Sequence, residues 1–209
     1  MFQPRVIDIY WNDDVDSDSF VKAQKAGIWG VIHKCTQGTT FKDPKYEERR
    51  QMAIDAGLLW GAYHFNEGNN VVGQVDNFLS HCNPDENTLV CLDFEPCKNN
   101  MSVSSAISFM NSVEKRIGKT CVMYSGSRLK ETIGDLSDAN IEYLNSRKLW
   151  IASYTSTLHL PKGIDKWWLW QYTGDGEGQS PQKVDGFKTV DLSIYNGKDR
   201  EQFGVEWID

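Results

Sequence analysis

The amino-acid sequence predicts an α/β fold, an irregular TIM-like barrel of eight strands with helices after the first five. Short runs rich in Val, Ile, Tyr and Trp recur along the chain, as half-buried or buried strands do. Segments with helical periodicity follow each of the first five of these runs, as connections between parallel strands require. No Gly-x-Gly-x-x-Gly or Walker loop follows the first run, which favours a barrel over an open doubly wound sheet.

The eight expected strands share this composition and are bounded by turn-forming or helical segments. They are Val6–Tyr10, Trp29–Lys34, Leu58–Phe65, Thr88–Glu95, Thr120–Ser125, Leu149–Tyr154, Trp167–Tyr172 and Val190–Tyr195.

Helical periodicity is clearest in two connections, Asn69–Cys82 and Ser102–Gly118, where apolar residues recur on one face. Gly118 suits the end of the second helix. Asp43, before Pro44, is a plausible start for an earlier helix that stops at Gly57.

The last connections differ from the first five. The segments Thr155–Lys166 and Thr173–Thr189 contain Gly, Pro and Ser and show no helical stripe. The sequence therefore predicts five strand–helix units followed by three strands that are joined mainly by loops.

The bulk composition predicts one domain over residues 1–209, because 40% hydrophobic and 24% charged residues are ordinary and no linker interrupts the chain. No run approaches the roughly 20 apolar residues of a membrane span, so we expect no membrane insertion. The net charge of −7 argues against nucleic acid as a partner.

The five cysteines are scattered, and Cys35, Cys91 and Cys121 lie in or beside strand-like runs. We expect buried free thiols in a protein made in a reducing compartment. No Cys-x-x-Cys or His-x-x-x-His pair occurs, so we expect no metal and no cofactor. The N-terminus has no basic head before a long apolar core, and we expect no signal peptide.

Acidic residues stand where the active end of a barrel would be. Asp8 lies in the first strand, Asp93 and Glu95 end the fourth, and Asp191 begins the eighth. Working residues of such barrels sit at the carboxyl ends of the strands. Aromatic residues at the other strand ends complete the prediction of an acidic cup with flat apolar walls.

The spacing of Asp93 and Glu95 places both side chains on one face of a strand, roughly 7 Å apart. Two carboxylates this close in a partly dry site cannot both ionise freely, so the pKa of one rises. A protonated acid beside an anionic one suits glycosidic bond cleavage. The alternative is a pair of solvated surface acids, which the preceding run LVCL disfavours.

Three other polar residues have two readings each. Lys34 either neutralises the nearby acids or contacts substrate. His33 and His64 are better explained as hydrogen-bonded filling of the interior than as ligands.

Eight motifs, in order through nearly the whole chain, resemble the glycoside hydrolase family 25 lysozymes, the Chalaropsis-type muramidases. The motifs are VIDIY, GVIHKCTQG, GAYHF, LVCLDFEP, CVMYSG, LWIASY, LWQYT and VDLSIYNG. The resemblance implies an irregular (β/α)5β3 barrel, which agrees with the loss of helical pattern after Leu149.

The resemblance also implies hydrolysis of the β-1,4 bond between N-acetylmuramic acid and N-acetylglucosamine in peptidoglycan, without a cofactor. By match to the family motifs, Glu95 is the general acid and Asp93 orients the substrate's N-acetyl group as it attacks the anomeric carbon, with retention. Asp8 and Asp191 match the two other family acids. Residues at substrate-binding positions are Lys34, Tyr63, Phe65, Tyr124, Tyr154 and Trp170.

The chain departs from the family pattern in two places. Two positions after the first acid, where a small polar residue is usual, stands Tyr10, followed by Trp11; in the loop after the second strand, Gln37 replaces a usual Glu. Both changes bear on subsite preference. Other readings are a chitinase-like hydrolase, whose longer acidic run Asp-x-x-Asp-x-Asp-x-Glu is absent, and a non-catalytic glycan-binding protein on the same barrel.

For the biological setting we expect a phage endolysin that acts as a monomer on peptidoglycan glycan strands and has no separate cell-wall-binding domain. It would be made in the host cytoplasm and released through a holin. A secreted bacterial autolysin or a delivered effector would have a similar sequence.

Overall fold

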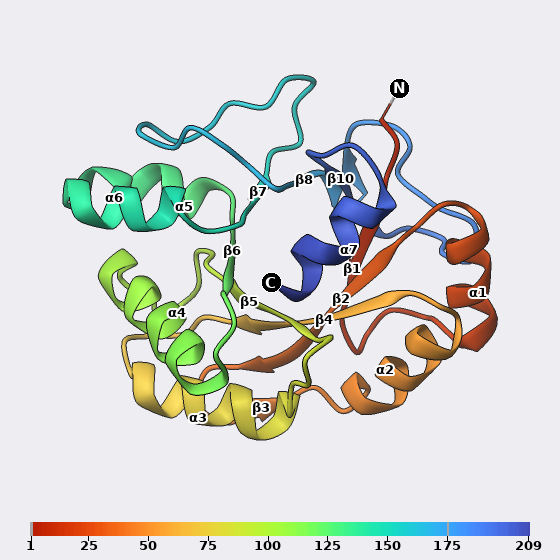
Figure 1. Cartoon of the computed structure of the whole chain (residues 1–209), viewed down its shortest axis with the longest axis horizontal. Helices are drawn as coiled ribbons and strands as arrows, with labels where there is room; N and C mark the ends of the chain where they lie inside the picture. The colour runs from red at the N-terminus through yellow and green to blue at the C-terminus, as the bar shows by residue number, and fades with distance from the viewer. Residues whose placement is uncertain (1, 175) are drawn as a thin grey trace.

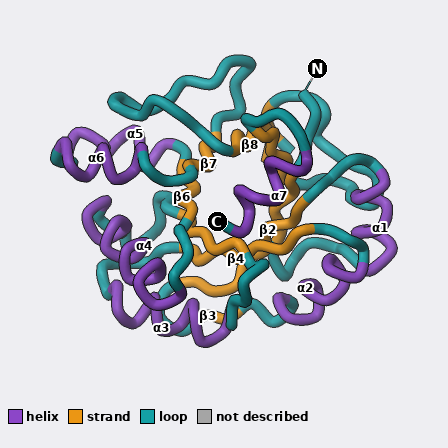
Figure 2. The backbone as a smooth tube through the Cα atoms, in the orientation of Figure 1, coloured by secondary structure: helices purple, strands orange, loops and turns teal. Residues whose placement is uncertain are grey.

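The computed structural model describes residues 2–174 and 176–209 and confirms the closed barrel of eight strands (Figure 2). The strands follow one another around the barrel, and β10 pairs with β1 to close it. In barrel order they are β1 (Val6–Ile9), β2 (Gly30–Gln37), β4 (Leu59–Phe65), β5 (Leu89–Asp93), β6 (Val122–Ser125), β7 (Leu149–Ala152), β8 (Leu169–Gly174) and β10 (Asp191–Tyr195). The two-residue strands β3 (Phe41–Lys42) and β9 (Glu177–Gly178) pair in antiparallel direction with β2 and β8, respectively.

Strand direction changes at the end of the chain. The first seven barrel strands are parallel, whereas β10 is antiparallel to both β8 and β1. An antiparallel neighbour needs no helical crossover. The beginning of β10 therefore lies beside the end of β1, and Asp8 and Asp191 are register partners.

Helices surround the barrel on most sides, and loops between β7 and β10 cover the remaining side (Figure 1). This confirms that a helix follows each of the first five barrel strands, and that within the described residues the connections from β7 to β10 contain no helix. The helices after the first five strands are α1 (Ser17–Lys25), α2 (Tyr46–Asp55), α3 (Val71–Cys82), α4 (Val103–Ile117), α5 (Ser127–Thr132) and α6 (Asp138–Asn145), with a 3-10 turn at Ile133–Asp135. None of the helices described is long and apolar enough to cross a membrane.

The start of α2 differs from the sequence prediction. The helix begins at Tyr46 rather than near Asp43. The Asp43 carboxylate instead accepts hydrogen bonds from the backbone N–H groups of Lys45 and Trp11, each at 2.9 Å. Asp43 therefore ties the loop after β1 to the segment before α2.

A further helix, α7 (Arg200–Ile208), was not predicted and closes the end of the barrel where the parallel strands begin (Figure 1). Its Trp207 indole N–H donates to the Trp60 carbonyl at 3.0 Å. A Cβ at Gly30 would lie 2.7 Å from Cη2 of Trp207, so the strand needs glycine there. Phe203 stacks on Trp168 with ring centres 5.7 Å apart.

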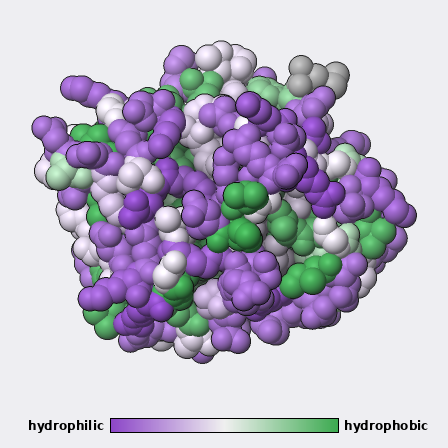
Figure 3. Space-filling model, in the orientation of Figure 1, coloured by the Kyte–Doolittle hydropathy of each residue, from purple (hydrophilic) through white to green (hydrophobic). Residues whose placement is uncertain are grey.

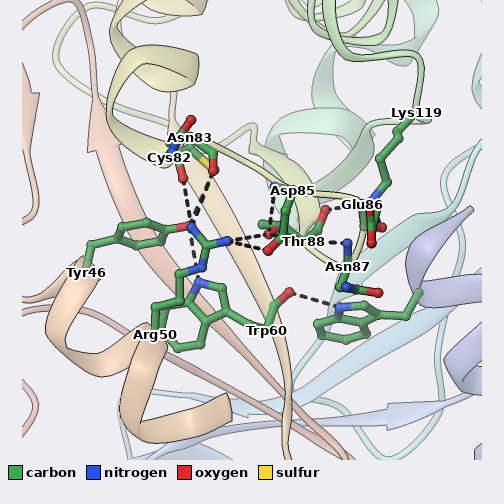
Figure 4. A network of polar contacts seen from close by, with 11 residues as sticks. Tyr46, Arg50, Trp60, Cys82, Asn83, Asp85, Glu86, Asn87, Thr88 and Lys119 are labelled. Carbon is green, nitrogen blue, oxygen red and sulfur yellow. Dashed lines mark hydrogen bonds and ion pairs between the residues drawn. The ribbon is translucent and has the colours of Figure 1, made fainter.

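Arg50 connects α2 to the segment between α3 and β5 (Figure 4). Its guanidinium pairs with Asp85 at 2.8 Å and donates to the carbonyls of Cys82 and Asn83. The face over α7 is mainly hydrophilic, with small and separate hydrophobic patches (Figure 3). The two ends of the barrel are thus different: one is closed by packing, and the other carries the predicted acids.

All five cysteines are free, and Cys35, Cys91 and Cys121 are buried as predicted.

Candidate active site

A cavity of about 370 Å³ opens at the carboxyl ends of the parallel strands. It contains eight of the ten residues that the sequence analysis assigned to the site: all four acids, together with Lys34, Tyr63, Phe65 and Tyr124. The full lining is Asp8, Ile9, Tyr10, Asp13, Lys34, Tyr63, Phe65, Asp93, Glu95, Tyr124, Trp150, Thr189, Val190 and Asp191.

Asp93 and Glu95 differ in depth. Asp93 ends β5 and is only 7% exposed, whereas Glu95 lies beyond the strand and is half-buried. Burial raises the pKa of the Asp93 carboxyl well above its ordinary value, the negative charge of Glu95 raises it further, and the Lys34 ammonium lowers it. A raised pKa, as predicted for one member of the pair, is therefore found at Asp93.

One carboxylate oxygen of Asp93 is a buried hydrogen-bond acceptor without a donor among the described residues. Oδ1 is buried and has no hydrogen-bond partner within the described part of the chain. An unsatisfied buried acceptor is costly unless a ligand supplies a donor. The position points to an N–H or O–H group of a bound molecule.

The backbone that carries the two acids is held from both neighbouring strands. The Asn66 side-chain amide, after β4, donates to the carbonyls of Asp93 at 3.1 Å and Glu95 at 3.0 Å. The Ser125 hydroxyl, at the end of β6, donates to the Phe94 carbonyl at 2.7 Å. All three carbonyls of the Asp93–Glu95 segment are thus bound, which fixes where the two side chains leave the backbone.

Gln171 connects the acids of β1 and β10. Its amide nitrogen donates to both carboxylate oxygens of Asp8 at 3.1 Å and to Asp191 at 3.3 Å. Burial raises the pKa of Asp8 well above its ordinary value, Asp191 adds to the rise, and the Gln171 hydrogen bond opposes it. The amide oxygen of Gln171 accepts from the hydroxyls of Tyr124 at 2.7 Å and Tyr154 at 3.1 Å.

Tyr154 therefore joins the site through Gln171, but the structure does not bring Trp170 to the cavity. Trp170 points to the other side of β8, since neighbouring side chains on a strand alternate. Its indole donates to the Ser153 carbonyl at 2.7 Å, and its ring packs edge-on against Phe2 at 5.1 Å. Trp150 lines the cavity instead, with its ring 4.5 Å from that of Tyr124.

Lys34 lies where either role considered for it is possible. Its ammonium lies 4.7 Å from the Phe65 ring centre and donates to the Gln37 side chain at 2.7 Å. Burial lowers the pKa of Lys34, while the negative charge of Asp93 raises it. The residue lines the cavity and also offsets the charge of the acids.

The two buried histidines are hydrogen-bonded parts of the protein interior, which confirms the prediction that they fill space rather than bind a ligand. His33 Nε2 faces the Arg49 guanidinium at 3.3 Å and must accept, because arginine only donates. His64 lies between Thr36 at 2.7 Å and Gln74 at 3.1 Å. Burial lowers the pKa of His33 to about 3 and that of His64 to about 4, so both rings are neutral.

Comparison with known proteins gives a family match over most of the chain. A sequence model described as glycosyl hydrolases family 25 matches residues 7–180. The uncharacterized protein YegX of Escherichia coli O6:H1 is 28% identical over 203 residues, which cover 93% of this chain and 70% of that protein. Lysozyme M1 of Streptomyces globisporus is 26% identical over 205 residues, covering 90% and 66%.

Solved structures share the same fold. The bacterial lysozyme of Streptomyces coelicolor superposes with a TM-score of 0.83 at 23% sequence identity. The alignment covers 100% of this chain and 98% of that one, so the barrel and its connections correspond from end to end.

Proposed function

Because the chain belongs to glycosyl hydrolase family 25 and is a glycoside hydrolase, we propose that it is an N-acetylmuramidase. It cleaves the β-1,4 bond between N-acetylmuramic acid and N-acetylglucosamine in bacterial peptidoglycan. One observation carries the proposal: Asp93 and Glu95 line one cavity at different depths, and a buried oxygen of Asp93 awaits a donor.

The two acids divide the first chemical step. Half-buried Glu95 donates its proton to the glycosidic oxygen as the bond from C1 to that oxygen breaks. The carbonyl oxygen of the substrate's own acetamide forms the new bond to C1. Asp93 accepts the acetamide N–H, and its raised pKa gives it the proton affinity to stabilise positive charge there.

The second step restores the enzyme. Glu95, now a carboxylate, takes a proton from water as the water oxygen bonds to C1 and the acetamide oxygen leaves. Two displacements at C1 give net retention. Asp8 and Asp191, linked by Gln171, place negative charge beside the oxocarbenium-like centre, and Tyr63, Phe65 and Tyr124 offer aromatic surface to the sugar rings.

The test is mass spectrometry of the muropeptides that purified protein releases from peptidoglycan. We expect new reducing ends on N-acetylmuramic acid and their loss in Glu95→Gln, with an unchanged circular dichroism spectrum. New ends on N-acetylglucosamine, turnover confined to chitin oligomers, or binding without products would each contradict the proposal.

For the biological setting we propose a phage endolysin made in a reducing cytoplasm. The free state of the five cysteines supports this, because disulfides form in oxidising compartments. Expression in a susceptible bacterium would lyse cells only when a holin is co-expressed. Lysis without the holin would contradict the proposal.

A further inference from the structure

We infer that Tyr10 and Trp11 form an additional sugar-binding subsite at the rim of the cavity, which holds an N-acetylhexosamine ring beyond the two that flank the cleaved bond. The inference rests on the proposed function, because it assigns the next part of the same glycan strand to this surface.

Both aromatic rings lie at the surface beside the acids. Tyr10 lines the cavity and is 40% exposed, and the neighbouring Trp11 is 46% exposed. Their ring centres are 6.2 Å apart at 82°, and among the described ring contacts Trp11 pairs with Tyr10 alone. Leaving two large rings in water forgoes the stabilisation that burial gives, which is typical of binding surfaces.

The backbone under these rings is fixed by a buried arginine. Arg49 is only 4% exposed, and its guanidinium donates to the carbonyls of Tyr10, Trp11 and Asp13. The Asp43 carboxylate accepts from the Trp11 N–H at 2.9 Å, and Asp13 accepts from the Tyr10 N–H at 2.7 Å. Binding there costs little ordering of the main chain, because the loop is already held in place.

The chemistry of the rim suits an uncharged sugar. Aromatic faces pack against the apolar side of a pyranose ring, and the Tyr10 hydroxyl, which accepts from Asn12 at 3.4 Å, offers a polar edge. The carboxylate of Asp13 also lines this part of the cavity and disfavours an anionic group. N-acetylglucosamine is therefore the expected occupant.

The first experiment measures binding without turnover. In the Glu95→Gln background, a hexamer of N-acetylglucosamine is titrated while tryptophan fluorescence is followed, with and without Trp11→Ala. We expect Trp11→Ala to remove part of the fluorescence change and to weaken binding about tenfold, with Trp11→Phe restoring most of the affinity. Equal affinity in both proteins would overturn the inference, whether or not the wild-type protein cleaves peptidoglycan.

The second experiment varies the length of the substrate. On long glycan strands we expect Trp11→Ala to lower kcat/KM about tenfold, and on the shortest strand that is cleaved to leave it unchanged. The matched control is Val205→Ala, an exposed apolar residue (64%) on α7 at the opposite end of the barrel, which should match wild type on both. An equal loss on short and long strands would overturn the subsite.

Discussion

The side-chain amide nitrogen of Asn66 lies 3.0 Å from the carbonyl oxygen of Glu95. The same nitrogen donates to the Asp93 carbonyl, and the Asn66 backbone N–H donates there as well, at 3.1 Å. Asn66 is fully buried, so these bonds are shielded from water. Asn66 is not among the residues that line the cavity, and its bonds fix the relative position of the two acids on which the proposed chemistry depends.

Loss of this support is expected to lower turnover more than binding. Asn66→Ala should reduce kcat by about 10- to 100-fold with little change in KM, because small displacements of reacting groups are costly. Asn77→Ala is the matched control: Asn77 is also buried and donates to two backbone carbonyls, those of Gly38 and Phe41, away from the acids. Steady-state kinetics and thermal unfolding of both variants make the check. Similar losses of kcat would contradict the positioning role.

Asp93→Asn is expected to abolish activity and to stabilise the fold at neutral pH. The pKa of Asp93 is raised in the folded state, so the folded protein holds this proton more tightly than the unfolded chain does. The stability of the fold is therefore highest below the unfolded pKa of about 4 and falls as the pH rises through the folded-state pKa. Asparagine removes the cost of burying the charge. Thermal unfolding at pH 7 and pH 4 measures this, and the gain in Tm should be larger at pH 7. Equal gains at both pH values would show that relief of a buried charge does not cause the stabilisation.

For the two buried histidines we expect the opposite dependence of folding stability on pH: stability falls as the pH becomes acidic. The folded-state pKa values of about 3 for His33 and about 4 for His64 lie below the ordinary value of 6.5. The unfolded chain therefore binds protons first, and stability falls as pH drops from about 6.5 towards 4, by up to about 1.4 kcal/mol per pH unit for each ring.

Urea unfolding between pH 4 and pH 8 tests this dependence. His64→Gln should flatten the slope, whereas His159→Gln, at an exposed position, should leave it unchanged. An unaltered slope in His64→Gln would show that other groups cause the acid sensitivity.

The sequence was informative where strand composition and strand ends carry the signal. The eight barrel strands follow from it, and so do the positions of the four acids in or beside these strands, because a carboxylate within or next to an apolar run is visible without knowing any contact. Gln171 was missed because the neighbouring Trp170, an aromatic residue, was predicted to bind substrate in its place. Strand alternation sends only one of the two inward, and the barrel register decides which. Asn66 was missed because its partners are backbone carbonyls of another strand, which no local pattern encodes.

The α7 helix was missed for a similar reason, since only Phe203 and Trp207 of its residues are buried and such a stripe is weak.

The long-range contact of α7 with the start of β2 can be tested by mutation. Gly30→Ala should destabilise the protein by about 1–3 kcal/mol, because the added Cβ would lie 2.7 Å from the Trp207 ring.

Trp207→Phe should also destabilise, by opening space and by losing the 3.0 Å hydrogen bond to the Trp60 carbonyl. The smaller ring leaves room for the Cβ, so the double variant should be more stable than the sum of the two single losses predicts. Urea unfolding of the four proteins measures the coupling, with activity as a second readout. Since α7 lies at the end of the barrel opposite the acids, KM should not change in any variant that remains folded. Strict additivity would mean that Gly30 and Trp207 do not share the close contact that the structure describes.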